Sequence, residues 1–335
     1  MNKKLKVAII GAGLVGNKRA KVIKDLNKEE LVLVADIDKE KAKNFAETYN
    51  CQFTTSWQEV VRRKDVDIVI VATPNNFLAR ISIAALKNGK HVLCEKPFGR
   101  NTKESEAILK AAEKAHRLIK VGFNHRFHPA IFQAKKLFDK GEIGKILFIR
   151  ARYGHGGRLG MEKEWRFKKA ISGGGELLDQ GVHLIDLSRW FGGEFQKVYG
   201  ITETKFWKSN LEDNAFVLMK NKNITVSFHV SATNWKNIFS FEVFGDKGFL
   251  VIEGVGRSYG EETLIFGKRK PEFGIPKIKI LKFFKDSSWK NEWQNFISAV
   301  KFGKRIIGDG RDGFEANRII EAIYRSSKSG RAVKL

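Results

Sequence analysis

The chain has 335 residues, of which 42% are hydrophobic, and this length and composition exclude a disordered protein and favour two globular domains. The formal net charge of +25 could indicate a nucleic-acid or membrane partner. However, the basic excess is +10 over residues 1–122 and +15 over residues 123–335, without a basic arm or tail, so we expect neither partner.

The cysteines and the N-terminal segment both favour a cytoplasmic protein. Cys51 and Cys94 provide no disulfide framework and no metal-ligand spacing, so we expect a reducing compartment and no metal. Lys3 and Lys4 precede an apolar run from Val7 to Gly16, as in a signal peptide, but basic residues follow the run at once. Ten residues are also too few to span a bilayer, so we expect a cytoplasmic protein.

The first predicted strand, residues 5–10, leads directly into a glycine-rich turn. The turn reads Gly11-Ala12-Gly13-Leu14-Val15-Gly16, and a helix is expected to follow it. Gly11 permits a tight turn, Gly13 permits a pyrophosphate to approach the backbone, and Gly16 permits the helix to pack on the sheet. The free N–H groups at the start of the helix would then bind the phosphates.

The second predicted strand, residues 31–35, ends at Asp36, which lies 25 residues after Gly11. A carboxylate in this place can accept hydrogen bonds from both ribose hydroxyls and would repel a 2′-phosphate. This position favours NAD, and NADP is not excluded. Asp38 is the competing carboxylate, and we expect it to cap the helix over residues 39–49.

Strands and helices continue to alternate up to Gly122. This alternation predicts a doubly wound parallel sheet, in which ligands bind beyond the carboxyl ends of the strands. Thr73-Pro74-Asn75 and Glu95-Lys96-Pro97 follow two such strand ends. Lys96 is therefore either a solvated turn residue or a group directed at a ligand. The further elements expected in this part are helices over 56–63, 77–88 and 102–116, and strands over 66–72, 91–94 and 118–122.

The pattern changes after Gly122, where we place the boundary between domains 1–122 and 123–335. An aromatic and basic segment, residues 123–127, precedes a helix over 129–139 and a strand over 145–153. A long polar loop follows, and such loops in compact domains are usually functional or mobile. The loop and the residues after it carry His155, Arg158, Lys163, Trp165 and Arg166.

A triple glycine, Gly173–Gly175, precedes a predicted helix over 176–191. Asp179, His183 and Asp186 fall at i, i+4 and i+7 and would form one stripe along that helix. Asp179 could then fix the tautomer of His183, as a general base requires. A purely structural histidine remains the alternative, and Asp186 would pair with Arg189 at i+3.

Residues 196–283 read as an antiparallel sheet, because apolar residues alternate with small polar ones, as in residues 224–231. A broad sheet with one partly uncovered face would serve as a substrate floor or a subunit interface, so we expect a homo-oligomer. Helices over 289–302 and 311–327 are expected to close the chain.

Taken together, these motifs resemble the Gfo/Idh/MocA family of NAD(P)-dependent oxidoreductases along essentially the whole chain. The matching segments share their order and separations with the family. They are Gly11–Gly16, Ala72–Asn75, Gly89–Val92 with Glu95–Pro97, Asn124 with Arg126, Trp165–Arg166, Gly173–Gly175 with Leu178–Asp179, and Gly181–His183.

The resemblance implies an α/β fold: an N-terminal Rossmann domain with a doubly wound parallel sheet, then an α/β domain with a large, mostly antiparallel open sheet. The implied reaction is hydride transfer between NAD and a secondary alcohol or ketone carbon of a sugar, polyol or sugar derivative. The second domain would bind substrate and hold a dimer or tetramer together.

The resemblance also implies site residues. Lys96, Asp179 and His183 would be catalytic: His183 would take the hydroxyl proton, Asp179 would orient it or the substrate, and Lys96 would hydrogen-bond the reacting oxygen. The Lys96–Pro97 bond is often cis in the family. Cofactor contacts would come from Gly11, Ala12, Gly13, Leu14, Val15, Gly16, Asp36, Ile37, Thr73, Pro74, Asn75, Glu95, Lys96 and Asn124. Substrate contacts would come from Lys96, Arg126, Arg158, Trp165, Arg166, Asp179 and His183.

Two departures from the family leave the substrate open. Leu78 stands where the family often has His, and His125 stands where Tyr is frequent. Arg158, Lys163 and Arg166 favour an anionic sugar or sugar nucleotide if they bind substrate, and they are solvated loop charges otherwise. An NAD-dependent glycoside hydrolase and a non-catalytic NAD-sensing regulator remain the alternatives to a dehydrogenase.

Overall fold

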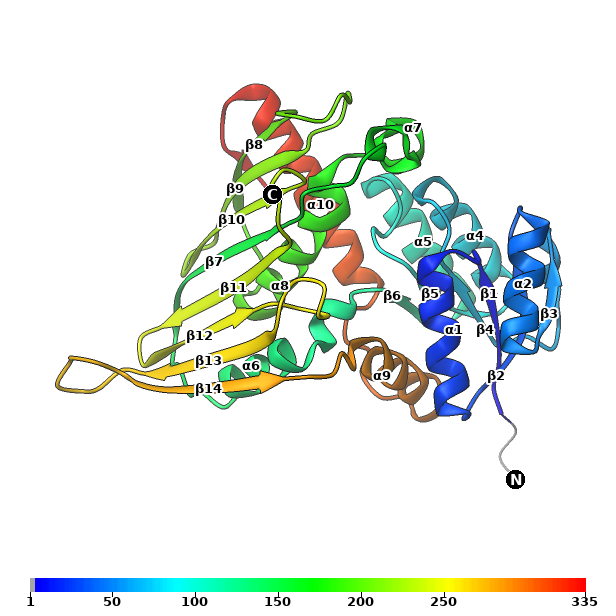
Figure 1. Ribbon diagram of the computed structural model, residues 1–335, viewed down its shortest axis with the longest axis horizontal. Coiled ribbons are helices and arrows are strands. Elements are labelled where there is room, and N and C mark those ends of the chain that lie inside the picture. Colours follow the sequence, from blue (N-terminus) through cyan, green and yellow to red (C-terminus); the bar gives the residue numbers. More distant parts are fainter. Residues whose placement is uncertain (1–3) are drawn as a thin grey trace. The chain divides into compact units, whose positions relative to one another are not determined.

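The computed structural model describes residues 4–335, so Lys3 of the basic N-terminal start lies outside the described residues. The chain divides into two compact units (Figure 1). The first ends at Phe123 and also takes in Trp289–Phe314, and the second comprises Asn124–Ser288 and Glu315–Leu335. The predicted boundary after residue 122 lies beside the first of these divisions, whereas the return of residues 289–314 to the first unit has no counterpart in the predicted domains.

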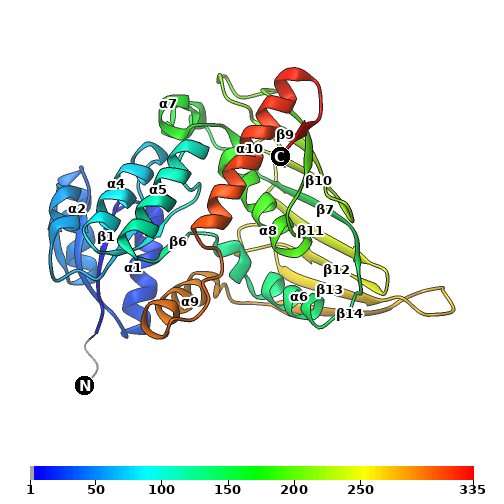
Figure 2. The same ribbon diagram turned by 180° about the vertical axis from the view of Figure 1, so that it is seen from behind.

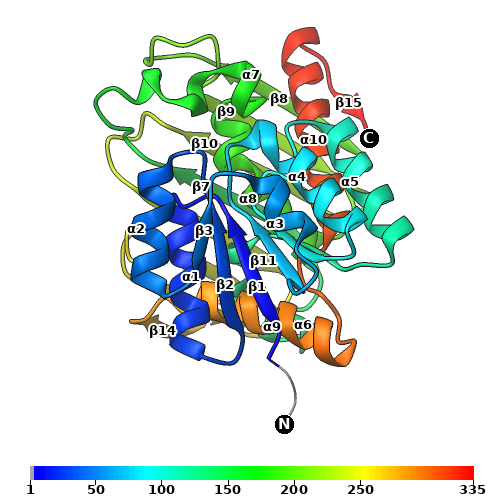
Figure 3. The ribbon, with the colours of Figure 1, turned by 90° about the vertical axis from the view of Figure 1, so that its right-hand side faces the viewer.

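The first unit is built on a six-stranded parallel sheet with the order β3-β2-β1-β4-β5-β6. The order reverses between β1 and β4, which is the switch point of a doubly wound sheet. Helix α1 packs beside α2, and α4 packs beside α5 (Figures 2 and 3). The predicted Rossmann fold is confirmed. Its elements are β1 (Lys6–Ile10), α1 (Leu14–Leu26), β2 (Glu30–Ala35), α2 (Lys39–Tyr49), β3 (Gln52–Thr54), α3 (Trp57–Arg62), β4 (Ile68–Val71), α4 (Asn75–Lys87), β5 (His91–Cys94), α5 (Thr102–Ala115) and β6 (Ile119–Val121).

The central strands of this sheet are apolar along their length because both faces are covered. Ile9, Ile70 and Leu93 are buried in one cluster, which also includes Trp293 and Phe296 of helix α9 (Ser288–Phe302). Helix α9 therefore completes the core of the first unit, although almost the whole second unit precedes it in sequence. The next helix, α10 (Gly310–Ser329), begins in the first unit and continues into the second.

The second unit is built on a nine-stranded sheet with the order β14-β13-β12-β11-β7-β10-β9-β8-β15. Every pairing in this sheet is antiparallel except that of β7 with β10. The expected large, mostly antiparallel sheet is confirmed. The strands are β7 (Ile146–Gly154), β8 (Lys197–Glu203), β9 (Asn214–Lys220), β10 (Thr225–Ser231), β11 (Ile238–Gly245), β12 (Gly248–Glu253), β13 (Glu262–Lys268), β14 (Lys277–Phe283) and β15 (Val333–Lys334).

Helices cover one face of this sheet. Helix α6 (Pro129–Asp139) packs on β12–β14, α8 (Val182–Gly192) packs on β7, and Ile323 of α10 lies against Gly200 of β8. The opposite face leaves large apolar side chains exposed, among them Ile201, Phe216 and Leu218. Short helical turns connect the elements at Asn124–Phe127 (η1), Met161–Lys163 (η2), Trp165–Phe167 (η3), Lys169–Ser172 (α7) and Leu177–Gly181 (η4).

Among the described residues 4–335, no helix is long and apolar enough to cross a membrane. No group of three or more His, Cys, Asp or Glu side chains in that range could hold a metal ion.

Candidate active site

The glycine turn after β1 has the geometry of a phosphate-binding turn. Gly11 has φ +107°, and a Cβ there would lie 2.4 Å from the carbonyl oxygen of Ala72. A Cβ on Gly16 would lie 2.0 Å from the carbonyl oxygen of Gly11, whereas Gly13 has nothing within 4 Å of that position. The turn therefore packs tightly against backbone at Gly11 and Gly16, whereas the space beside Gly13 is open. Because no side chain caps the start of α1, its N-terminal N–H groups can receive an anion.

Asp36 is held in place at the end of β2. Its Oδ2 accepts a hydrogen bond from the Ala12 N–H at 2.8 Å, and its Oδ1 accepts one from the Asp38 N–H at 3.0 Å. The competing carboxylate, Asp38, caps α2 by accepting from the Lys41 N–H, as expected. Beside Asp36, the apolar side chains of Ile37 and Leu14 are 88% and 76% exposed. An open turn, a fixed carboxylate and two uncovered apolar side chains fit an adenine dinucleotide with a free 2′-hydroxyl.

Lys96 lies at the same edge of the sheet as the glycine turn. Strands β1, β4 and β5 are neighbours, so the residues that follow them, including Thr73, Asn75 and Lys96, come out at one carboxyl edge. Lys96 is half-buried, Asn75 is buried, and the Lys96–Pro97 peptide bond is cis, as the family resemblance implied. Thr73 Oγ1 is buried and has no hydrogen-bond partner in the protein, so a cofactor atom could supply one.

The carboxylate of Glu95 is committed to the interior of the first unit. Arg19, which is fully buried on α1, donates from Nε to Glu95 Oε1 at 2.7 Å and from Nη1 to Glu292 Oε2 at 2.5 Å. Burial raises the pKa of Glu95 more than the charge of Arg19 lowers it. These contacts join α1, the residue before Lys96, and α9. Sequence reasoning assigned Glu95 to cofactor binding and found neither its partner Arg19 nor the second carboxylate, Glu292, that Arg19 also binds.

In the second unit, the segment around Asp179 is not the predicted α-helix. Residues Leu177–Gly181 form a π-helical turn, and the α-helix begins only at Val182. The carboxylate of Glu212 accepts hydrogen bonds from the N–H groups of Gly175 and Leu177 at 3.0 and 3.2 Å. A Cβ on Gly175 would lie 2.2 Å from the Glu212 carbonyl oxygen, so this close approach requires glycine.

The π turn replaces regular α-helical spacing between Asp179 and His183, and the contact expected between these two side chains stays a prediction. Arg166 Nε lies 3.5 Å from Asp179 Oδ2. His183 is buried near the start of α8. Its ring stacks on that of His125, with centroids 3.7 Å apart and an angle of 22° between the rings. Sequence reasoning noticed His125 only as a departure from the family and gave it no role.

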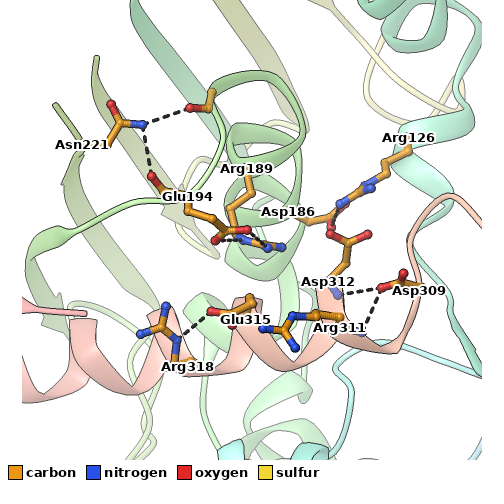
Figure 4. A network of polar contacts seen from close by, with 11 residues as sticks. Arg126, Asp186, Arg189, Glu194, Asn221, Asp309, Arg311, Asp312, Glu315 and Arg318 are labelled. Atoms are coloured by element: carbon orange, nitrogen blue, oxygen red, sulfur yellow. Dashed lines mark hydrogen bonds and ion pairs between the residues drawn. The ribbon is translucent and has the colours of Figure 1, made fainter. Parts of the chain in front are cut away.

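Asp186 pairs with Arg126 and not with Arg189, which corrects the expected i+3 pair. Arg126 donates from Nε and Nη2 to the two carboxylate oxygens of Asp186 at 2.8 and 2.6 Å, and both residues are buried (Figure 4). Arg189 instead donates to both carboxylate oxygens of Glu194 at 3.1 and 2.5 Å. Arg126 therefore fixes η1 to α8, and its neighbour Asn124 is also buried, with Oδ1 3.2 Å from His125 Nδ1.

The two arginines of the polar loop have carboxylate partners within the second unit. Arg158 donates to both oxygens of Glu164 at 2.7 and 2.6 Å. Arg166 lies 3.6 Å from Glu164 and stacks over Trp165, with its guanidinium carbon 4.6 Å from the ring centroid. Burial lowers the pKa of His155, but the hydrogen bond and charge of Glu176 outweigh burial and raise it overall.

Comparison with known proteins places the chain in a family. The model described as "Oxidoreductase family, NAD-binding Rossmann fold" matches residues 5–123, and the model described as "GFO/IDH/MocA C-terminal domain" matches residues 131–251. Levoglucosan dehydrogenase of Pseudarthrobacter phenanthrenivorans is 33% identical over 338 residues, covering 88% of this chain and 87% of that protein. Myo-inositol 2-dehydrogenase of Thermotoga maritima is 26% identical, covering 99% of this chain and 98% of that protein.

A solved structure titled "Levoglucosan dehydrogenase, complex with NADH and levoglucosan" superposes with a TM-score of 0.90 at 24% identity. It covers 99% of both chains and shows that the two share their fold. The glycine turn and Asp36 both lie within the residues that the Rossmann-fold model matches. The chain therefore belongs to the Gfo/Idh/MocA family of oxidoreductases, with an NAD-binding Rossmann domain at its N-terminus.

Proposed function

We propose that the protein is an NAD-dependent dehydrogenase that oxidises a secondary alcohol of a neutral cyclic sugar or polyol. The observation that carries the proposal is the single carboxyl edge of the first sheet, where the glycine turn, Thr73–Asn75 and Lys96 come out together. A dinucleotide held by the turn would extend along this edge toward Lys96. The names of the relatives, which include levoglucosan, inositol and glucoside dehydrogenases, support the substrate class.

The catalytic roles follow from the chemistry of the side chains. NAD, when bound, accepts the hydride from the substrate carbon. His183 takes the proton of the reacting hydroxyl on a ring nitrogen, which requires its imidazole to be neutral. Lys96 donates a hydrogen bond to the same oxygen, and Asp179, oriented by Arg166, binds the substrate or the imidazole. These three assignments remain proposals.

The pairing of the loop cations supports a neutral substrate over an anionic one. Arg158 and Arg166 face Glu164 and Asp179, so an anionic substrate would have to compete with carboxylates already in contact. We therefore expect neutral sugars and polyols to be better substrates than sugar acids or sugar nucleotides. Equal kcat/KM values for matched neutral and anionic sugars would contradict this part of the proposal.

The decisive experiment measures net formation of reduced nicotinamide with NAD and a panel of free sugars and polyols. Lys96→Ala should lower kcat by about 100-fold or more, because it removes a group acting on the reacting oxygen. Lys103→Ala, an exposed lysine on α5, is the matched control and should leave kcat unchanged. Full activity of Lys96→Ala would refute the catalytic assignment.

The same experiment separates the alternatives. A glycoside hydrolase would cleave a glycoside without net reduction of NAD. A regulator would bind NAD, raising its melting temperature, without turning over any sugar of the panel. The free thiols Cys51 and Cys94 support the proposal that the protein works in a reducing, cytoplasmic environment.

We also propose that a second copy of the chain covers the open face of the nine-stranded sheet. Ile201, Phe216 and Leu218 expose 41%, 44% and 48% of their surface there, around a hollow of about 550 Å³. Contiguous apolar surface of this kind marks association sites. Light scattering should give a dimer or tetramer, and Phe216→Asp should lower the mass while Leu159→Asp, in an exposed loop, should not. A wild-type monomer would refute the proposal.

A further inference from the structure

The imidazole that the proposed mechanism uses as a base is one of a stacked pair. His125 lies in η1 and His183 lies in α8, and their side chains are 6% and 3% exposed. The ring centroids are 3.7 Å apart. At this separation and an effective dielectric constant of about 20, two positive charges repel by the equivalent of about three pKa units. The pair therefore accepts a second proton only at a much lower pH than the first.

His125 has an oxygen atom at each ring nitrogen. Asn124 Oδ1 lies 3.2 Å from Nδ1, and Tyr153 Oη lies 3.2 Å from Nε2. An amide oxygen only accepts, and a phenol oxygen can accept when its own proton is donated elsewhere. Tyr153 shares a hydrogen bond with Tyr259, which offers that outlet. Both N–H groups of a protonated His125 would thus be satisfied inside the protein.

Further ionisable groups lie around His125. The ring of His128 meets it edge-on at 5.3 Å, and His128 Nδ1 lies 3.2 Å from Glu262 and 3.7 Å from Asp286. Arg126, the neighbouring cation, is neutralised by its two bonds to Asp186. The titratable and charged groups around the stack include Arg126, His128, Tyr153, Glu176, Asp179, Asp186, Tyr259, Glu262 and Asp286.

We propose that His125 is a positioning residue for His183: it holds the single proton that the stacked pair accepts on acidification, so that the imidazole of His183 stays neutral. The stacking fixes the plane of the His183 ring at the same time. This inference rests on the proposed function, in which His183 is the base. It assigns a role to a residue at which this chain departs from its family.

The test is a proton titration of the full-length chain with its seven histidines labelled with ¹³C and ¹⁵N. In the wild type, His125 should protonate first, and His183 should remain neutral to a pH lower by about two units or more. In His125→Phe, which keeps an aromatic ring but has no basic nitrogen, the midpoint of His183 should rise by about one to three units. His183 protonating first, or an unchanged midpoint in the variant, would overturn the proposal.

Kinetics provide the second readout. The acid limb of kcat/KM against pH should move upward in His125→Phe by the same amount as the midpoint of His183. His125→Tyr, the residue frequent in the family, should show the same movement and provides the answer if the Phe variant does not fold. His116→Asn, an exposed histidine at the end of α5, is the control and should leave the limb in place.

The two readouts separate this inference from the proposed function. If the titration follows the expected order but no sugar is oxidised, the proton-holding role of His125 stands and the dehydrogenase proposal fails. If sugars are oxidised through His183 but His125 stays neutral while His183 protonates, the proposed function stands and this inference fails.

Discussion

Replacement of Arg19 by Met should destabilise the protein in a way that depends on pH. The substitution keeps a long side chain but leaves the carboxylates of Glu95 and Glu292 buried together without the cation that now bonds to both. Removing one partner of a buried ion pair typically costs about 3–5 kcal/mol. We expect a loss in this range in the free energy of unfolding at pH 7.

The loss should shrink on acidification. Burial already raises the pKa of Glu95 from its ordinary value of 4.5, and Arg19 opposes this rise. Without Arg19, the folded Glu95 carboxylate binds a proton still more tightly than the unfolded one. The free energy of unfolding of the variant therefore rises as the pH falls from the raised folded pKa toward 4.5. In the wild type, the retained Arg19 limits this gain.

The assay is urea unfolding of wild type and variant at pH 7 and pH 5. Arg19→Met combined with Glu292→Gln should recover part of the loss at pH 7, because one of the two buried charges is gone. Arg63→Met is the matched control: Arg63 pairs with the partly exposed Asp65, and this variant should lose about 1 kcal/mol or less. A loss for Arg19→Met that is equal at the two pH values would refute the reasoning.

Two further outcomes are expected. Asp36→Asn keeps the size of the side chain but removes the charge that faces the ribose. The ratio of kcat/KM for NAD to that for NADP, measured by steady-state kinetics with each cofactor, should therefore fall by about 10-fold or more. An unchanged ratio would show that Asp36 does not select the cofactor. Burial raises the pKa of Cys51 to about 11 and that of Cys94 to about 12. Neither thiol should therefore react with a thiolate-specific reagent at pH 8 until urea unfolds the chain. Rapid labelling of the native protein would contradict this prediction.

The Rossmann half could be predicted closely from sequence because its signals are local. The predicted helix over 39–49 coincides with α2, and the strand over 91–94 coincides with β5. A local signal was equally effective in the second unit, where the predicted helix over 129–139 coincides with α6. Capping by Asp38 and the initial Pro129 define where two of these helices begin. The glycine turn and Asp36 were found because their spacing is fixed by the ligand that such a turn binds.

Features decided by distant partners could not be predicted. The sequence predicted a helix over 289–302, which is α9, but the sequence pattern of a helix does not indicate which sheet that helix will cover. The π turn before Val182 begins beside Glu212, which is more than 30 residues away in sequence and accepts hydrogen bonds from the backbone N–H groups of Gly175 and Leu177. Arg189 bonds to Glu194 rather than to Asp186, because Arg126 approaches Asp186 from another element and binds both its oxygens.

The position of α9 has a consequence for how the protein is made. Trp293 and Phe296 belong to the core of the first unit, so that core cannot close until the ribosome has synthesised nearly the whole chain. Strand β7 of the second unit pairs with β10 and β11, residues 225–231 and 238–245, which are synthesised well before α9. Domains that form from a contiguous stretch of chain can fold during synthesis, whereas one completed by a later segment must wait for it. Both units are thus completed late in synthesis, the first by Trp289–Phe314 and the second by Glu315–Leu335, although the first unit begins at the N-terminus.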